Sequence, residues 1–225
     1  MIVLLLITTA ASSQTRNELR LELIKNHYPL TDWKMAKHFL LKELFIQEDD
    51  QGFFLRDVYC HHIIRKNVSP TTMPNGSVIN IEHTWPQSKF TKKKSKVQKS
   101  DLHHLFPTDT KVNNERANHT FYNLDTSNPM TECPASKLGY NRALRQVSFQ
   151  PPVEHRGNVA RALFYFAVRY KGKINNVEEA VLKIWNIVDP VDEEEMNRNN
   201  EIEKMQGNRN IFIDQPELAN SLSDF

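Results

Sequence analysis

Two side chains able to do acid–base chemistry stand next to each other at Glu82 and His83, at the end of a β-branched run that Pro86 stops. On an extended strand, adjacent side chains point to opposite faces, so the pair could serve one reaction centre only if the chain bends there. Pro86 favours such a bend. A neutral imidazole, with an ordinary pKa of about 6.5, is a suitable general base for water.

An amide oxygen donor follows at Asn113. Thr108 or Asp109 is a good helix N-cap, so Asn113 is predicted in the first turns of a short helix. Carboxylate and amide oxygens suit Mg²⁺, Mn²⁺ or Ca²⁺ better than Zn²⁺. Together with His83, Glu82 and Asn113 therefore indicate metal-assisted hydrolysis of phosphodiesters.

A basic loop lies between these donors. The net charge of the chain is only +2, but residues 84–100 carry six lysines and no acid. Such a face would concentrate a polyanion, although a solvated loop is the plain alternative for any lysine run. We assign five of the lysines to phosphate contacts: Lys92, Lys93, Lys94, Lys96 and Lys99.

Two other functions use the same residues. A zinc site built from Cys60, His61 and His62 lacks the spacing that lets neighbouring ligands share a tetrahedral ion. A non-catalytic nucleic-acid-binding module would need the basic loop but not Glu82, His83 or Asn113, and all three are present. Hydrolysis is therefore preferred, with the binding module as the alternative.

The elements that must position these groups are predicted from periodicity. A chain of 225 residues with 39% apolar and 25% charged residues is neither disordered nor fibrous. Two amphipathic helices are predicted between Arg16 and about Gln47, broken near Pro29 and with a cap at Leu30-Thr31-Asp32. Strands are predicted over Phe53–Cys60 and Val78–Ile81.

The C-terminal half is predicted to be helical. An apolar stripe from Val159 to Tyr170 indicates a core helix with Arg156, Arg161 and Arg169 on its exposed face, although the Arg156 and Arg161 motif could equally pair with an acidic helix. Helices are also predicted from Val177 to Val188 and, with an N-cap at Asp189-Pro190, to about Met205. These patterns favour one mixed domain.

The N-terminus and the two cysteines give information about the cellular compartment in which the protein works. Residues 1–13 contain an apolar run of signal-peptide length, although no basic residue precedes it, and a buried N-terminal segment is the alternative. Cys60 and Cys133 are compatible with one disulfide, which two thiols alone do not establish. In the chain-entropy model such a bridge would contribute roughly 4 kcal/mol.

Six motifs in one order closely resemble the bacterial endonuclease I family, whose members are periplasmic or secreted His-Me finger (ββα-metal) nucleases. The resemblance runs from about residue 57 to Glu217. The motifs are Asp57-Val58-Tyr59, Ile81 to Ser88 (IEHTWPQS), Asp101 to Pro107 (DLHHLFP), Val112 to Asn118 (VNNERAN), Arg156 to Ala162 (RGNVARA) and Gln206 to Asn210 (QGNRN).

This resemblance implies an α+β fold in which a ββα-metal finger, about residues 53–119, is embedded in a mainly helical single domain over residues 14–225. It also implies that His83 is the general base and that cleavage leaves 5′-phosphate and 3′-hydroxyl ends. Glu82 and Asn113 would hold one divalent cation, for which Mg²⁺ is the first choice and Mn²⁺ or Ca²⁺ the alternatives. Where some members place an arginine against the leaving group, this chain offers lysines, so no residue is assigned that role. Asp101 and Arg116 are interpreted as supporting or packing residues. His103 and His104 match the family pattern, and both a structural hydrogen-bonding role and a catalytic role stay open for them.

The expected protein is a secreted or periplasmic nuclease that acts on DNA, RNA or both with little sequence specificity. Lysine contacts to phosphate position a backbone without reading bases. No membrane partner is expected, and we expect a monomer.

Overall fold

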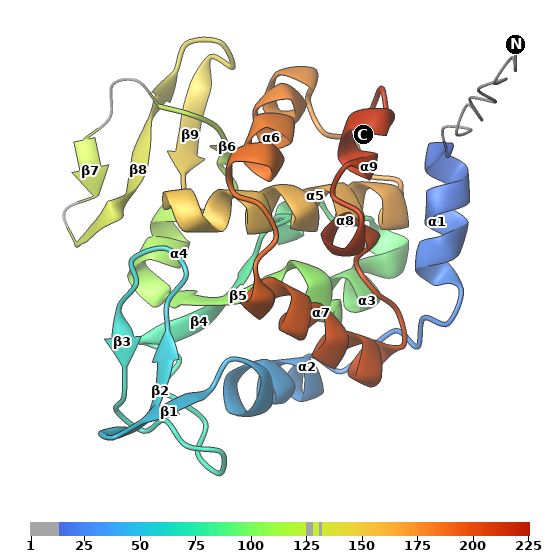
Figure 1. The fold of residues 1–225 in the computed structure, drawn as a ribbon. Helices are drawn as coiled ribbons and strands as arrows, with labels where there is room; N and C mark the ends of the chain where they lie inside the picture. The colour runs from blue at the N-terminus through green and yellow to red at the C-terminus, as the bar shows by residue number, and fades with distance from the viewer. Residues whose placement is uncertain (1–13, 125–127, 131) are drawn as a thin grey trace, which may run out of the picture.

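The helix α5 (Arg156–Tyr170) crosses the middle of the molecule, and the other elements pack around it (Figure 1). The computed structural model describes residues 14–124, 128–130 and 132–225. The apolar stripe from Val159 to Tyr170 is buried, as predicted, and helices and small sheets are mixed along the chain. The α+β class is therefore confirmed, whereas the predicted signal peptide at 1–13 lies outside the described residues.

The predicted placement of Arg161 and Arg169 on an exposed face of α5 is wrong, whereas Arg156 is partly exposed. Arg161 and Arg169 are buried, and 13 of the 15 residues of α5 are enclosed by other elements. Arg161 pairs with Glu195 of the acidic helix α7 (Glu193–Gln206), the internal pairing that the sequence left as the alternative. An apolar stripe marks the buried face of a helix but does not show whether the opposite face is covered too.

The N-terminal helices form as predicted. Thr15 and Glu18 make a capping box at α1 (Arg16–Ile24), and the Asp32 carboxylate caps α2 (Trp33–Phe39), which continues as a π-helical turn over Leu40–Leu44.

The strands form three small antiparallel or mixed sheets. β1 (Gln47–Asp49), β2 (Gly52–Arg56) and β3 (Ile63–Ile64) make the first, and β4 (Ile79–His83) pairs with β5 (Leu105–Asp109) in the second. The third has the order β6-β9-β8-β7 and consists of β6 (Thr120–Phe121), β7 (Asn128–Met130), β8 (Cys133–Asn141) and β9 (Gln146–Gln150).

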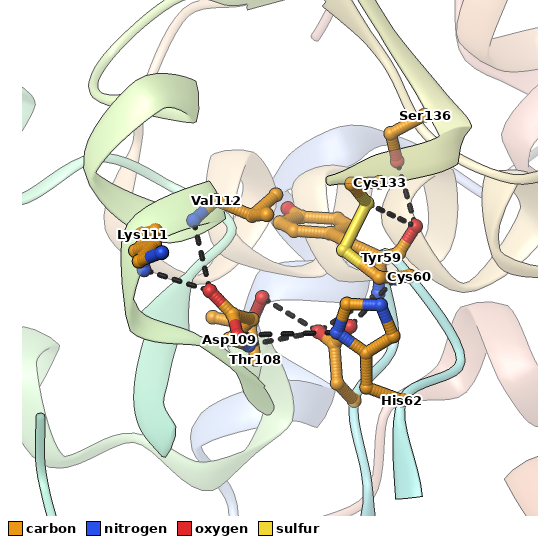
Figure 2. The surroundings of a disulfide bond; sticks show 10 residues. Tyr59, Cys60, His62, Thr108, Asp109, Lys111, Val112, Cys133 and Ser136 are labelled. Atoms are coloured by element: carbon orange, nitrogen blue, oxygen red, sulfur yellow. Dashed lines mark hydrogen bonds and ion pairs between the residues drawn. A yellow bond between two sulfur atoms is a disulfide. The ribbon is translucent and has the colours of Figure 1, made fainter. Parts of the chain in front are cut away.

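The strand predicted over Phe53–Cys60 ends earlier, at Arg56. The Asp57 carboxylate accepts hydrogen bonds from the backbone N–H groups of Tyr59 and Cys60, so the chain turns there instead of extending. The turn places Cys60 against Cys133, and the two form a disulfide (Figure 2). The bridge is flanked by a hydrogen bond from the Ser136 hydroxyl to the Tyr59 carbonyl, at 2.9 Å.

The remaining elements are short helices around the β4–β5 hairpin and longer ones at the C-terminus. The acidic helix α7 starts at Glu193 and is capped by Asp192, not by Asp189. Asp189 instead accepts a hydrogen bond from the Gly157 N–H at the start of α5. The other helices are α3 (Ser95–Ser100), α4 (Thr110–Arg116), α6 (Asn176–Val188), α8 (Ile211–Asp214) and α9 (Leu218–Ser221), with 3₁₀ turns over Gln87–Lys89, Lys92–Lys94, Leu102–His104 and Val153–His155.

Across the described ranges, none of the helices combines the length and the apolar character needed to cross a bilayer.

Candidate functional site

The site is built on β4, β5 and α4, which follow one another closely in space. Asp109 ends β5, and its carboxylate accepts hydrogen bonds from the backbone N–H groups of Lys111 and Val112, so α4 begins directly after the strand. Pro107, which has no N–H, stands opposite Ile81 in the hairpin. The backbone polar groups of Ile81 therefore point away from β5. The Ile81 carbonyl oxygen accepts a hydrogen bond from the Asn113 side-chain amide at 3.2 Å.

A pocket of about 500 Å³ opens at this outer edge of β4. Residues from β4, α4, α2 and the segment between β4 and β5 line it together. The lining residues that bear on chemistry are Trp33, Glu82, His83, Gln87, Lys99, Asn113 and Arg116. The three residues predicted to do chemistry, Glu82, His83 and Asn113, are thus brought to one cavity, even though Glu82 and His83 are strand neighbours.

His83 is held in one tautomer. Its Nε2 lies 3.0 Å from the Lys99 carbonyl, which can only accept a hydrogen bond, so Nε2 carries the proton. Nδ1 keeps its lone pair and lies 3.3 Å from the Gln87 side-chain amide. Burial lowers the pKa of His83 to about 3, so the ring is neutral at pH 7. The ring of Trp33 packs on it with centroids 5.1 Å apart.

Glu82 is 1% exposed and is anchored through one of its two oxygens. The Tyr59 hydroxyl donates to Oε1 at 3.0 Å, and the Arg116 guanidinium lies 3.1 Å from the same oxygen. Burial raises the pKa of the Glu82 carboxyl, and the positive charge of Arg116 and the Tyr59 hydrogen bond oppose that rise. Since both contacts go to Oε1, Oε2 takes part in neither.

Asn113 is half-buried, and its orientation is fixed by the acceptor it meets. Because the Ile81 carbonyl can only accept, the amide nitrogen of Asn113 points to it, which leaves Oδ1 outside this contact. The pocket therefore offers Glu82 Oε2 and Asn113 Oδ1, two hard oxygen atoms of the kind that Mg²⁺, Mn²⁺ and Ca²⁺ prefer. The donor chemistry fits one hard divalent cation with further positions open to solvent.

The predicted lysines separate into two groups. Lys99 lines the pocket, and its amine lies 5.3 Å from the Trp33 ring centre. The other four, Lys92, Lys93, Lys94 and Lys96, are exposed on the 3₁₀ turn and on α3 and are not part of the pocket lining.

Of the residues interpreted as supporting, Arg116 touches the site and Asp101 and His103 do not. Asp101 accepts hydrogen bonds from the hydroxyls of Tyr165 and Tyr170, and the His103 ring bonds the Asn208 carbonyl, all inside the protein. His104 lies between the two regions. Its ring is 5.5 Å from that of His83, and its Nε2 lies 2.7 Å from the Gln98 carbonyl.

Sequence reasoning assigned no role to Tyr59, Trp33 or Gln87, which the structure places at the site. Tyr59 lies in one of the six motifs, so a signal for it existed. Trp33 lies about fifty residues before His83 in the chain, and nothing local marks it.

A second group with metal-ligand atoms is Asp57, Cys60 and His62, whose candidate ligand atoms lie within 4.8 Å of one another. Cys60 offers no thiolate, because its sulfur is bonded to that of Cys133. The Asp57 carboxylate already accepts hydrogen bonds from the Thr108 hydroxyl and from three backbone N–H groups. This group is structural, and it gives no support to the zinc alternative.

Comparisons with known proteins match this chain to nucleases. It is 38% identical over 161 residues to the extracellular ribonuclease of Bacillus subtilis, which covers 64% of this chain and 53% of that protein. It is 34% identical over 115 residues to an extracellular deoxyribonuclease of Aeromonas hydrophila, covering 51% of this chain and 48% of that protein. It is 28% identical over 170 residues to endonuclease-1 of Buchnera aphidicola subsp. Acyrthosiphon pisum, covering 68% of this chain and 64% of that protein.

The chain spans about half to two thirds of the length of these relatives. The match to a whole family is broader, because the family model described as Endonuclease I covers residues 11–217, which include every element from α1 to α8. The residues of the pocket all lie within that span. The chain belongs to the endonuclease I family.

Proposed function

We propose that this protein is a metal-dependent endonuclease that hydrolyses phosphodiester bonds of DNA, RNA or both with little sequence specificity. The observation that carries the proposal is that a His83 ring with a fixed tautomer lines the same pocket as Glu82 and Asn113. Relatives named as ribonucleases and as deoxyribonucleases support either polymer as substrate.

His83 acts as the general base through Nδ1. The Lys99 carbonyl keeps the proton on Nε2, so Nδ1 is the nitrogen free to take a proton from the attacking water. The Gln87 amide, 3.3 Å from Nδ1, stands where that water would have to approach, and it is exposed and can move aside. Proton removal from water then generates the nucleophile.

Glu82 and Asn113 hold one divalent cation, for which Mg²⁺ is the preferred ion and Mn²⁺ or Ca²⁺ the alternatives. When bound, the cation supplies charge stabilisation at the scissile phosphate and at the departing 3′-oxygen. Arg116 and Tyr59 fix the Glu82 carboxylate through Oε1, so Oε2 is presented without rotation of the side chain. The products are a 5′-phosphate and a 3′-hydroxyl end.

The phosphates of the substrate are held by lysines. Lys99 at the pocket and the exposed Lys92, Lys93, Lys94 and Lys96 contact the polymer backbone as point charges. Such contacts position the strand without selecting bases, which accounts for low sequence specificity.

The finger is formed by β4, β5 and α4 within a single domain over residues 14–225. We propose that residues 1–13 are a signal peptide and that the protein is exported, as extracellular and periplasmic relatives are, and works as a monomer. A disulfide is compatible with an oxidising compartment.

Incubation of the purified protein with plasmid DNA and with total RNA, each with Mg²⁺, Mn²⁺ or a chelator, tests the proposal. We expect cation-dependent cleavage of at least one polymer, with 5′-phosphate ends that a ligase accepts without kinase treatment. If both polymers are bound but remain intact under every condition, the protein is the non-catalytic binding module.

A further inference from the structure

A second cationic pocket lies between α1 and the C-terminal end of α5, and it shares no lining residue with the candidate active site. It has a volume of about 260 Å³ and is lined by Arg16, Asn17 and Arg20 of α1 and by Val168 and Lys171. Three of its five lining residues carry a positive charge and none carries a negative one. We propose that this pocket binds a backbone phosphate of the nucleic-acid strand at a distance from the cleaved bond, an inference that rests on the proposed function.

The positive charges of this pocket are not neutralised by acids. In the part of the chain that the structure describes, Arg16, Arg20 and Lys171 form no ion pair with a carboxylate. At 100° per residue, Arg16 and Arg20 share one face of α1, whereas Glu18 and Glu22 fall roughly on the opposite face. The pocket therefore keeps its full charge for an anion.

Two of these positively charged side chains, Arg16 and Arg20, have surroundings that the fold determines. The Arg16 guanidinium donates to the carbonyls of Ala167 and Gly172 at the end of α5, which fixes its position without cancelling its charge. The Arg20 Nε is buried and has no hydrogen-bond partner among the described residues. An unmet buried donor is unfavourable in the free protein, and a phosphate oxygen is an acceptor that would satisfy it.

Two lysines at opposite ends of α3 relate this pocket to the candidate active site. Lys99, whose carbonyl holds His83, stands near the end of α3, and Lys94 is the residue before α3 begins. At 1.5 Å per residue, the two lie roughly 7.5 Å apart along the helix, about two nucleotides of a duplex strand at 3.4 Å per nucleotide. Burial and the positive charges of Arg169, Arg20 and Lys171 lower the pKa of the Lys94 amine, which agrees with Lys94 standing next to the second pocket.

The strand would thus run from the cleaved bond at His83, along α3, to the pocket between α1 and α5. A substrate of only a few nucleotides cannot reach that pocket, whereas a longer one can. The subsite therefore predicts that catalytic efficiency rises with substrate length and that this gain depends on Arg20 and Lys171.

The test uses a variant carrying Arg20→Gln and Lys171→Asn, because the Lys171 φ of 59° is a conformation that Asn adopts readily. The control carries Lys66→Gln and Arg142→Gln, which remove two exposed charges far from α1. Cleavage rates are measured on single strands of about four and about sixteen nucleotides, long enough in the second case to span both pockets. We expect the subsite variant to lose roughly fivefold to tenfold in kcat/KM on the long strand and less than about twofold on the short one.

Binding is measured separately on a His83→Ala background, with the long strand over a range of salt concentrations. Loss of this one phosphate contact should lower the slope of log K against log salt by about 0.7, and the control should leave the slope unchanged. Unchanged length dependence and slope in the subsite variant would overturn the inference. The inference would also be overturned if the subsite variant lost binding to vesicles of phosphatidylglycerol while its binding to the strand was unchanged. The pocket would then serve a lipid surface. If the wild type cleaves neither strand, the proposed function fails. The salt slopes of strand binding still test whether the second pocket binds a phosphate.

Discussion

The two nitrogens of His83 are made different by their partners. A carbonyl at Nε2 and an amide at Nδ1 leave one protonation pattern for the neutral ring, so the basic nitrogen is already selected before substrate arrives. Neither of these contacts is made by Glu82 or Asn113. The role of His83 can therefore be separated from the roles of Glu82 and Asn113 by mutation.

We expect His83→Ala to reduce cleavage by about 10²-fold to 10⁴-fold, the usual contribution of a positioned general base. Folding and cation binding should be retained, since His83 is not among the residues that we propose to hold the cation. Initial rates on plasmid DNA, a thermal melt and Mn²⁺ binding by electron paramagnetic resonance check the three statements. Turnover close to that of the wild type would remove His83 as the base.

Tyr59 is expected to act through Glu82. Tyr59→Phe removes the hydroxyl that donates to Glu82 Oε1, so the carboxylate is less well oriented, and the Mg²⁺ concentration needed for half-maximal activity should rise. The free energy of unfolding should fall by about 1.5–3 kcal/mol, because the lost hydrogen bond goes to a charged group.

Tyr170→Phe is the matched control for this prediction. It also removes a buried tyrosine hydroxyl from a carboxylate, that of Asp101, but away from the pocket. We expect a comparable loss of stability with an unchanged Mg²⁺ titration. Equal titrations for the two variants would mean that Tyr59 only stabilises the fold.

The sequence was enough to predict the chemical groups of the candidate site, but not the residues that hold those groups in place. Glu82, His83 and Asn113 could be selected by type, because few side chains are able to bind a hard cation or take a proton from water. The packing of Trp33 on His83 and the hydrogen bond from Tyr59 to Glu82 join segments far apart in the chain. Such contacts depend on how α2 and the turn after β2 pack against β4, which no local pattern encodes.

At the scale of elements, α4 is joined to β4 through Arg116. Its guanidinium lies 3.1 Å from Glu82, donates to the Thr84 carbonyl at 2.8 Å and packs over the Phe121 ring. Removal of one partner of a buried ion pair leaves the other charge without compensation, which usually costs about 3–5 kcal/mol. Arg116→Met should therefore destabilise the fold by this amount in urea unfolding, and Arg116→Lys, which keeps the charge, by less.

The pH dependence of Arg116→Met provides a further check of the same element. Burial raises the pKa of Glu82 above its ordinary value of 4.5, and loss of Arg116 raises it further. Between the unfolded and folded pKa values the folded state binds more protons, so its stability falls as the pH rises through that interval. The destabilisation of Arg116→Met relative to wild type should thus shrink as the pH falls toward the unfolded value. A constant difference would mean that Glu82 does not sense Arg116.

Local signals identified the longer helices and the strands β2 and β4, and the errors in their bounds and caps have physical causes. The Asp109 cap of α4 was predictable because capping depends on nearby backbone N–H groups. Asp189-Pro190 has the same local signature, but tertiary structure uses the Asp189 carboxylate for Gly157 and leaves the cap of α7 to Asp192. Two competent caps three residues apart cannot be ranked from sequence.

The disulfide links the turn after β2 to β8, and thereby the first sheet region to the third. Cys60→Ser with Cys133→Ser should lower the free energy of unfolding by up to about 4 kcal/mol in the chain-entropy model. Urea unfolding of this variant, and of the wild type with and without reductant, measures the effect. A variant as stable as the oxidised wild type would show that the core alone holds the two regions together.

At the scale of the whole molecule, a net charge of +2 conceals two opposed regions. The lysines of the 3₁₀ turn and Lys96 of α3 are exposed, and so are most acids of α7, whereas Glu195 turns inward to Arg161. Separation of charge on a near-neutral protein lets one face attract a polyanion while the molecule as a whole stays weakly charged. The uneven charge was visible in the sequence, but the sequence could not tell which charges would be used internally.

Attraction by the lysine face should appear as salt dependence of binding. A variant with Lys92→Gln, Lys93→Gln and Lys96→Gln on a His83→Ala background removes three exposed charges outside the pocket, so the slope of log K against log salt for single strands should fall by about 2. A control with Lys66→Gln, Arg142→Gln and Lys204→Gln changes the net charge equally but elsewhere. Equal slopes in the two variants would mean that net charge, and not the lysine face, attracts the polymer.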